Sequence, residues 1–223
     1  MTLPPITERG RAIAGLIDHT LLKSDATSTP VVSLCREATH YGFAAVCVNP
    51  RLLPVAVVEL ATSAVKVAVT VGFPLGATAS ETKAFEAERA AGRGAAELDM
   101  VLAIGDLKER KYSAVAQDIA GVVAAAAGRT VKVILETHLL TDDEKVTACR
   151  IALEAGAHFV KTSTGFTGGG ATEADVRLMR RIVGDRMGVK ASGGIRDLPV
   201  AEAMIRAGAS RIGTSAGVAI VTR

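Results

Sequence analysis

The sequence predicts an α/β protein that folds as one (β/α)8 barrel, a TIM barrel, in a single domain spanning residues 1–223. Short runs rich in Val and Ile alternate with Ala-rich segments of helical periodicity along the whole chain. Eight such runs share 223 residues, or about 28 residues for each strand–helix unit. This regular series favours a closed barrel over the main alternative, an open doubly wound sheet.

The eight expected strands are short apolar runs separated by helical segments and Gly-containing turns. In chain order they lie at residues 16–17, 44–48, 67–71, 95–101, 131–135, 159–160, 189 and 212. Residues 6–15 predict an extra N-terminal helix that would close the bottom of the barrel. Only ten residues follow Gly213, so the last helix is expected to be short.

Three helix starts support this division. Thr29-Pro30 predicts an N-cap followed by a first-turn proline. The pairs Thr141 with Glu144 and Thr172 with Asp175 match the capping-box pattern, a hydroxyl followed three residues later by an acid. All three starts fall between expected strands, as alternating units require.

A repeated spacing predicts which strand residues lie together. Four times, a Gly at an expected helix end precedes a notable residue by five positions, in the pairs Gly42 and Cys47, Gly94 and Asp99, Gly156 and Lys161, and Gly208 and Gly213. The repeats fall on every second strand, and alternate strands of this barrel share a side-chain layer. We therefore expect the second member of each pair to share one layer near the strand ends.

Two lysines at strand ends carry the predicted chemistry. Lys161 and Lys190 each end an apolar run that continues into a turn of small residues. A second ammonium about 4 Å away opposes the charge of a lysine by roughly 4 kcal/mol, or about 3 pKa units. That would leave one amine free to form a Schiff base. The alternatives are a phosphate ligand or a salt-bridged lysine. Lys66 and Lys132 are placed at strand starts and are expected to be structural.

Other polar residues at strand ends complete the candidate site. Asp99 is a carboxylate in an apolar strand that could move protons or only neutralise the lysines. Asp18 and Thr20 end the first strand, where Asp18 could orient Lys190 or substrate hydroxyls, or form a structural ion pair. Cys47 is a candidate substrate contact, although core packing is the commoner use of a free cysteine.

Glycine turns after the last strands predict a phosphate site. Ser192-Gly193-Gly194 and Gly213-Thr214-Ser215 follow the seventh and eighth strands, where barrels of this type commonly bind phosphate. Gly165, after the sixth strand, could add to the same site.

Composition narrows the functional classes. The formal charge is +3 without a basic run, so nucleic acid and membrane surfaces are not expected as partners. The apolar stretch 52–71 contains Pro54, Glu59 and Lys66, which argues against a membrane span. No signal-peptide pattern precedes the first strand. The three cysteines lack metal-ligand spacing, so we expect reduced thiols, a cytoplasmic location and no metal.

Six motifs together resemble the deoxyribose-phosphate aldolase family of class I, Schiff-base aldolases. They lie at residues 17–23 (IDHTLLK), 46–50 (VCVNP), 72–76 (GFPLG), 97–101 (ELDMV), 161–166 (KTSTGF) and 190–196 (KASGGIR). The resemblance implies reversible cleavage of 2-deoxy-D-ribose 5-phosphate to acetaldehyde and D-glyceraldehyde 3-phosphate, in deoxyribonucleoside catabolism. It also implies a homodimer or homotetramer that works without a metal or cofactor.

The resemblance gives each candidate residue a role. Lys161 would form the Schiff base, Lys190 would be the neighbouring ammonium, and Asp99 would donate and accept protons. Phosphate would be bound by Gly165, Gly193, Gly194 and Ser215. Some family members carry a Lys where this chain has Phe166, so phosphate recognition here is expected to rely on backbone groups.

Three alternatives remain open at this point. The chain could be a class I aldolase for another sugar phosphate, or a barrel that binds phosphosugars without turnover. It could also hold pyridoxal phosphate on Lys161, in which case the protein would absorb visible light as isolated.

Overall fold

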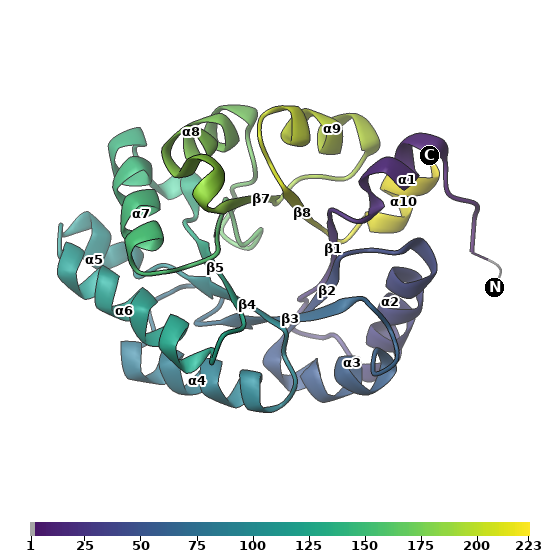
Figure 1. The fold of residues 1–223 in the computed structure, drawn as a ribbon, viewed down its shortest axis with the longest axis horizontal. Helices are drawn as coiled ribbons and strands as arrows, with labels where there is room; N and C mark the ends of the chain where they lie inside the picture. The colour runs from purple at the N-terminus through teal and green to yellow at the C-terminus, as the bar shows by residue number, and fades with distance from the viewer. Residues whose placement is uncertain (1–2) are drawn as a thin grey trace.

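Eight parallel strands close into a barrel, and helices form a ring around it (Figure 1). The computed structural model describes residues 3–223. Each strand pairs in parallel with the next, and β8 pairs with β1. This closure confirms the predicted barrel and excludes the open sheet. The strands are β1 Ile17–Leu21, β2 Ala45–Val48, β3 Lys66–Val71, β4 Glu97–Val101, β5 Thr130–Ile134, β6 Phe159–Lys161, β7 Gly188–Ser192 and β8 Arg211–Thr214.

The helices connect successive strands on the outside of the barrel. The α-helices are α1 Glu8–Ala14, α2 Ser28–Tyr41, α3 Leu53–Glu59, α4 Ser80–Gly92, α5 Ile104–Lys108, α6 Tyr112–Ala125, α7 Asp142–Glu154, α8 Glu173–Val183, α9 Leu198–Arg206 and α10 Gly217–Thr222. Single 3-10 turns lie at Pro50–Leu52, Thr137–Leu139 and Gly184–Arg186. The last helix, α10, has six residues, so the expected short ending is confirmed.

The predicted helix starts are correct at two of three places. The Thr141 hydroxyl accepts the N–H of Glu144, whose carboxylate accepts the N–H of Thr141, which completes a capping box. The Thr172 hydroxyl caps α8 by accepting the N–H of Asp175 at 3.1 Å. The prediction at Thr29 is wrong, since α2 begins at Ser28 with Thr27 as its N-cap. Pro30 fits in the first turn because the N–H groups there have no helical partner to lose.

The extra N-terminal helix exists but does not lie across the bottom of the barrel. It lies beside α10 in the outer ring (Figure 1). The N–H of Thr7 donates to the carbonyl of Val221 at 2.9 Å. A Cβ at Gly10 would lie 2.1 Å from that carbonyl oxygen, so only glycine permits this approach. The helix therefore holds α10 in place.

Strand alternation separates an apolar layer from a polar interior. Outward residues such as Leu98, Val133 and Val189 are fully buried in the core between strands and helices. Inward residues of β2 and β3 form a small apolar cluster with Leu22, which follows β1; its members are Leu22, Ala45, Cys47 and Ala68. Charged side chains from β1 and from β4 to β8 lie together instead, all buried except the partly buried Arg211 of β8, and they form the candidate site.

Candidate active site

Three lysines meet on one carboxylate inside the barrel. Asp99 Oδ2 lies 2.8 Å from Lys161 Nζ and 2.7 Å from Lys190 Nζ. Asp99 Oδ1 lies 2.7 Å from Lys132 Nζ. All four side chains are buried. The predicted placement of Asp99 in the same layer as Lys161 is thus confirmed, and the carboxylate bridges the lysines.

Lys132 is a member of this cluster that the sequence reasoning misplaced. It was expected at a structural strand start, but it is the third residue of β5 and lies directly opposite Asp99 in the strand register. Its ammonium also lies 2.5 Å from Glu97 and 3.5 Å from Asp18. The available signal was the two-residue alternation, which turns residue 132 inward between two outward valines. Lys66 is exposed at the start of β3, as expected.

A second group of charges lies against the lysines. Asp18 Oδ2 lies 2.5 Å from Lys190 Nζ, and Asp18 Oδ1 lies 2.7 Å from Arg211. Arg211 also approaches Glu97 at 3.4 Å. Asp18 therefore orients Lys190, one of the two roles that the sequence left open. Arg211 and Glu97, which begin β8 and β4, were not predicted at all.

Lys161 and Lys190 have opposite pKa shifts. Burial lowers the pKa of Lys161, Asp99 opposes this, and the ammonium of Lys190 adds to the lowering. Burial also acts against the charge of Lys190, but Asp18 and Asp99 outweigh it and raise the pKa of that lysine. The expected lowered amine at Lys161 is confirmed in direction. Its main cause is burial, however, with Lys190 in the secondary role.

Asp99 stays ionised in this cluster. Burial works to raise its pKa, but Lys132, Lys161 and Lys190 together hold the pKa well below the usual range of an aspartate. Lys161 and Lys190 bond the same oxygen of Asp99, so the carboxylate bridges the two amines and is placed to pass protons between them.

A cavity of about 250 Å³ opens at the carboxyl ends of β1, β6, β7 and β8. Its lining includes Lys161 and the predicted Thr20, Gly165, Gly193, Gly194 and Ser215. The sequence reasoning missed Lys23 and Arg196, which line it as well and bring two cationic side chains to the predicted phosphate site.

Two predicted substrate contacts lie below this cavity. Cys47 is fully buried in the cluster with Ala45 and Ala68, and burial raises the pKa of its thiol. It therefore packs the interior, the alternative that the sequence analysis left open. Asp18 is fully buried too, and its bonds go to Lys190 and Arg211. Neither residue belongs to the cavity wall.

The loops after β6 and β7 are tied together. Thr162 Oγ1 donates to the carbonyl of Ser192 and accepts its N–H, both at 3.0 Å. Ser192 Oγ donates to the carbonyl of Ser163 at 2.6 Å. Gly193 follows with φ of 88°, and a Cβ there would lie 3.0 Å from the Cα of Gly170. These contacts fix the turns in which the predicted phosphate-binding glycines lie.

Glu136 anchors the β6 loop from below. Its fully buried carboxylate accepts the N–H of Thr164 at 3.2 Å and also accepts the Thr164 hydroxyl. Its own backbone is left-handed, with φ of 57°, which is rare for a residue other than glycine. The sequence analysis had assigned it no role, because the pattern gave no sign of this conformation.

Two aromatic rings meet over the mouth of the barrel. Phe73 follows β3 and Phe166 follows β6, strands that are not neighbours in the barrel. Their ring centroids lie 5.2 Å apart in an edge-to-face arrangement. Phe166 is half exposed and lines the cavity. The ring pair therefore adds an apolar edge to an otherwise polar site.

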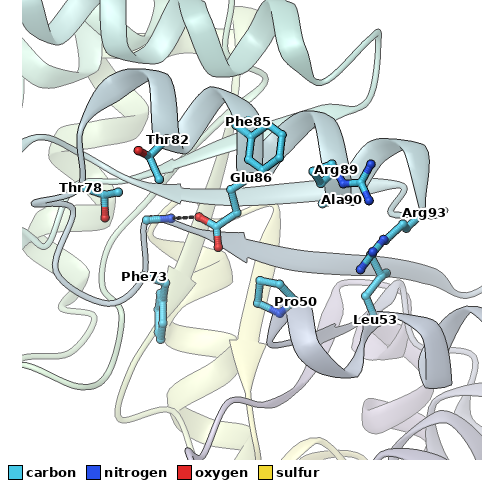
Figure 2. Close-up of a pocket in the computed structure, with 11 residues that line it drawn as sticks. Pro50, Leu53, Phe73, Thr78, Thr82, Phe85, Glu86, Arg89, Ala90 and Arg93 are labelled. Atoms are coloured by element: carbon cyan, nitrogen blue, oxygen red, sulfur yellow. Dashed lines mark hydrogen bonds between the residues drawn. The ribbon is translucent and has the colours of Figure 1, made fainter.

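Figure 2 shows a second hollow of about 450 Å³ on the outside of the barrel, along α4. Its lining includes Phe73, Phe85, Arg89 and Arg93. The Glu86 carboxylate there is engaged by the N–H of Gly72 at 2.7 Å. Although larger, this hollow is lined by none of the buried lysines of residues 3–223, so we place the chemistry in the smaller cavity.

Two further searches cover the described part of the chain. Among residues 3–223, no group of three or more His, Cys, Asp or Glu side chains is arranged to hold a metal ion. Within the same range, none of the helices combines the length and apolarity needed to cross a membrane.

Known proteins resemble this chain over nearly its whole length. Residues 12–223 match the family model described as DeoC/LacD family aldolase. A protein from Halalkalibacterium halodurans named deoxyribose-phosphate aldolase is 58% identical over 213 residues, which is 95% of each chain. A solved structure from Coccidioides immitis is 45% identical, with a TM-score of 0.93 over 98% of this chain and 87% of that one. A tetrameric deoxyribose phosphate aldolase from Aeropyrum pernix is 36% identical, with a TM-score of 0.89 over 95% of this chain and 90% of that one. The chain therefore belongs to the DeoC/LacD family of aldolases.

Proposed function

We propose that this protein reversibly cleaves 2-deoxy-D-ribose 5-phosphate to acetaldehyde and D-glyceraldehyde 3-phosphate through an imine on Lys161. The observation that carries the proposal is one buried amine of lowered pKa on a cavity wall, bonded to Asp99 and beside a charged lysine. The relative from Halalkalibacterium halodurans, with 58% identity, bears the name of this activity. The opened sugar phosphate is the substrate whose aldehyde such an amine would attack.

The chemistry follows from the protonation of the two lysines. Neutral Lys161 attacks the C1 aldehyde, and the carbinolamine loses water with a proton from the Lys190 ammonium. The resulting iminium draws the electrons of the C2–C3 bond as the C3 hydroxyl loses its proton. Glyceraldehyde 3-phosphate leaves, and protonation and hydrolysis of the enamine release acetaldehyde. Asp99, together with Lys190 and a water, relays these protons, and its bonds to both amines support that role.

The phosphate would lie among the glycine turns. In this proposal the phosphate is bound by the backbone N–H groups of Gly165, Gly193, Gly194 and Ser215. The proposal is supported by the fact that all four residues line the cavity. Lys23 and Arg196 would add the positive charge that Phe166 does not supply. The phosphate group would thus sit at the polar end, away from the apolar edge made by the Phe73–Phe166 pair.

Borohydride reduction in the presence of acetaldehyde tests the proposal. The wild type should gain an ethyl group on Lys161, located by peptide mass spectrometry, and Lys161→Ala should gain none. Lys108→Ala, which removes an exposed lysine, is the matched control and should be modified like the wild type. An ethyl group on Lys190, or no adduct at all, would overturn the roles assigned here.

The same experiment separates the other candidate functions. A phosphosugar-binding barrel without turnover would bind phosphate but trap no acetaldehyde. An aldolase for another sugar phosphate would trap a different carbonyl donor, so dihydroxyacetone-type ketones belong in the donor set. A visible absorption band in the isolated protein would favour pyridoxal phosphate on Lys161.

We also propose that the protein is a cytoplasmic homodimer or homotetramer. Exposed apolar side chains on and before α3 and α4, namely Val58, Leu75 and Phe85, support burial against a second copy. The tetrameric relative from Aeropyrum pernix supports the same proposal. The three cysteines are buried free thiols, which fits a reducing compartment. Light scattering coupled to size-exclusion chromatography should give the mass of two or four chains, and a monomer would contradict the proposal.

A further inference from the structure

The buried charges around Lys161 form one continuous network. Arg211 bonds Asp18 and approaches Glu97, Glu97 bonds Lys132, and Asp18 bonds Lys190. Lys132, Lys161 and Lys190 then converge on Asp99. Within residues 3–223 the network thus joins four basic groups to three carboxylates.

The charges of this network balance only if one basic group is neutral. With every group ionised, the sum is one positive charge in a mostly buried cluster, which water screens poorly. Lys161 pairs with one carboxylate, whereas Lys132 and Lys190 each pair with at least two. Loss of the Lys161 proton therefore removes the excess charge and breaks the fewest ion pairs.

We propose that Arg211 and Glu97 are positioning residues that set the ionisation of Lys161 through the charge sum of this network. Neither side chain reaches the cavity, and each acts through Asp18, Lys132 and Asp99. The inference rests on the proposed function, because Lys161 is taken as the amine that forms the imine. It adds that the neutral state of the Lys161 amine depends on charges at the far end of the network as well as on its immediate neighbours.

Lys161 and Arg211 lie at the two ends of the network, and each is faced by groups from several strands. Lys161 is faced by Asp99 from β4, Lys190 from β7 and the Cys47 thiol from β2. Arg211 is faced by Asp18 from β1, Glu97 from β4 and the ring of Phe159 from β6, with its guanidinium carbon 5.6 Å from the ring centroid. Lys132 from β5 links the two sets.

A change at either end should reach Lys161 because the groups in between keep their partners. Without Arg211, Asp18 still pairs with Lys190, and Glu97 still pairs with Lys132. Without the Glu97 charge, Lys132 still pairs with Asp99 and Asp18, and Arg211 still pairs with Asp18. These groups therefore keep an ion pair in each variant, and Lys161, with its single ion pair, is the group that responds.

The two neutralising variants should shift Lys161 in opposite directions. Glu97→Gln removes a negative charge and should lower the pH at which half of Lys161 is free amine. Arg211→Gln removes a positive charge and should raise it. A unit charge on the order of 10 Å away, at an effective dielectric of about 20, gives a shift of roughly one pH unit. The double variant restores the sum and should return the midpoint to the wild-type value.

Trace labelling with acetic anhydride measures this midpoint without any catalysis. The acetylated fraction of Lys161 is followed against pH by peptide mass spectrometry, with thermal melts to identify folded variants. Arg211→Lys keeps the charge and should keep the wild-type midpoint, whereas Lys108→Gln controls for an exposed charge. The borohydride-trapping rate with acetaldehyde, measured over the same pH range, should show the same shifts.

The outcomes are distinct. Opposite shifts that cancel in the double variant would establish the inference, and either single variant suffices for a sign if the other fails to fold. The inference would be overturned if neither variant shifted the Lys161 midpoint, if both shifted it in the same direction, or if the double variant did not return it to the wild-type value. Shifted labelling without any trapped imine in the wild type would instead refute the proposed aldolase chemistry and leave the charge network standing.

Discussion

Gly213 is the position where a single added methyl group should disturb the site most directly. A Cβ on Gly213 would lie 2.9 Å from both Lys190 Cε and Ser192 Cβ. Ordinary carbon contacts are about 3.5–4.0 Å, so a neighbour must move by more than about half an ångström. Lys190 is held by Asp18 and Asp99, and Ser192 is part of β7, so neither can retreat freely. The sequence analysis placed Gly213 in the Lys161 layer, and the structure shows which lysine needs the space.

The size of the effect of Gly213→Ala follows from this crowding. Overpacking a buried site typically costs about 1–3 kcal/mol, which in a chain of this length lowers Tm by roughly 2–12 °C. A displaced Lys190 ammonium would donate its proton from the wrong place, and sub-ångström errors of this kind reduce kcat by about tenfold or more. KM should change less than kcat, because Gly213 lines the cavity but its added Cβ would press on Lys190 and Ser192, not on Gly193 or Gly194.

The assay is the steady-state cleavage of 2-deoxy-D-ribose 5-phosphate, with a thermal melt of each variant. Gly105→Ala is the matched control, because a Cβ there meets nothing within 4 Å and α5 gains a better helix former. That variant should keep its kcat and be slightly more stable. Wild-type kcat and Tm in Gly213→Ala would show that Lys190 has room to move, and the crowding argument would be wrong.

Four further outcomes follow from the same geometry. Lys190→Met should lower kcat about 10²-fold or more through loss of the proton donor, measured by steady-state cleavage; a fall of less than about threefold would remove its role. Glu136→Gln should loosen the β6 loop and raise KM for phosphorylated substrate several-fold, with KM for unphosphorylated deoxyribose as the control that stays unchanged. Phe166→Lys should lower KM for the phosphate ester and make it more sensitive to salt, and an unchanged salt dependence would place the phosphate elsewhere. Burial works to raise the pKa of Asp18, but Lys190, Lys132 and Arg211 outweigh it and hold the pKa below its usual value. The stability that the ionised Asp18 contributes is therefore complete above about pH 4 and is lost as the pH falls. Tm should drop below about pH 4, and a flat Tm there would contradict the ion-pair assignment.

The barrel could be predicted from the sequence because its signals are local. Gly42, Gly94, Gly156 and Gly208 all have positive φ in the structure, so the spacing built on them counted strands correctly. Side-chain alternation within each strand then follows from strand geometry. The same reasoning brought Asp99 and Lys161 into one layer, although they are 62 residues apart.

The lower part of the site could not be predicted because it depends on how strands tilt against each other. Arg211 and Glu97 each begin a strand, and in the sequence such residues are typical of a solvated barrel rim. They face each other only because β8 and β4 lie on different sides of a closed barrel whose interior they both enter. The prediction for Lys132 was wrong for a simpler reason, because the sequence analysis began this strand at residue 131, whereas β5 begins at Thr130.

The assignment of nucleophile and acid rests on partner number more than on the distance between the two lysines. Burial acts against the charge of both Lys161 and Lys190, so burial alone would lower the pKa of both amines. The pKa of Lys190 is raised instead, because this lysine has two carboxylate partners, whereas Lys161 has only Asp99, which it shares with other lysines. The Lys190 ammonium lowers the pKa of Lys161 further, and so adds to the difference between the two pKa values that Asp18 has already created. A neutral amine at the cavity wall and a charged one behind it are therefore two consequences of the same uneven distribution of carboxylates.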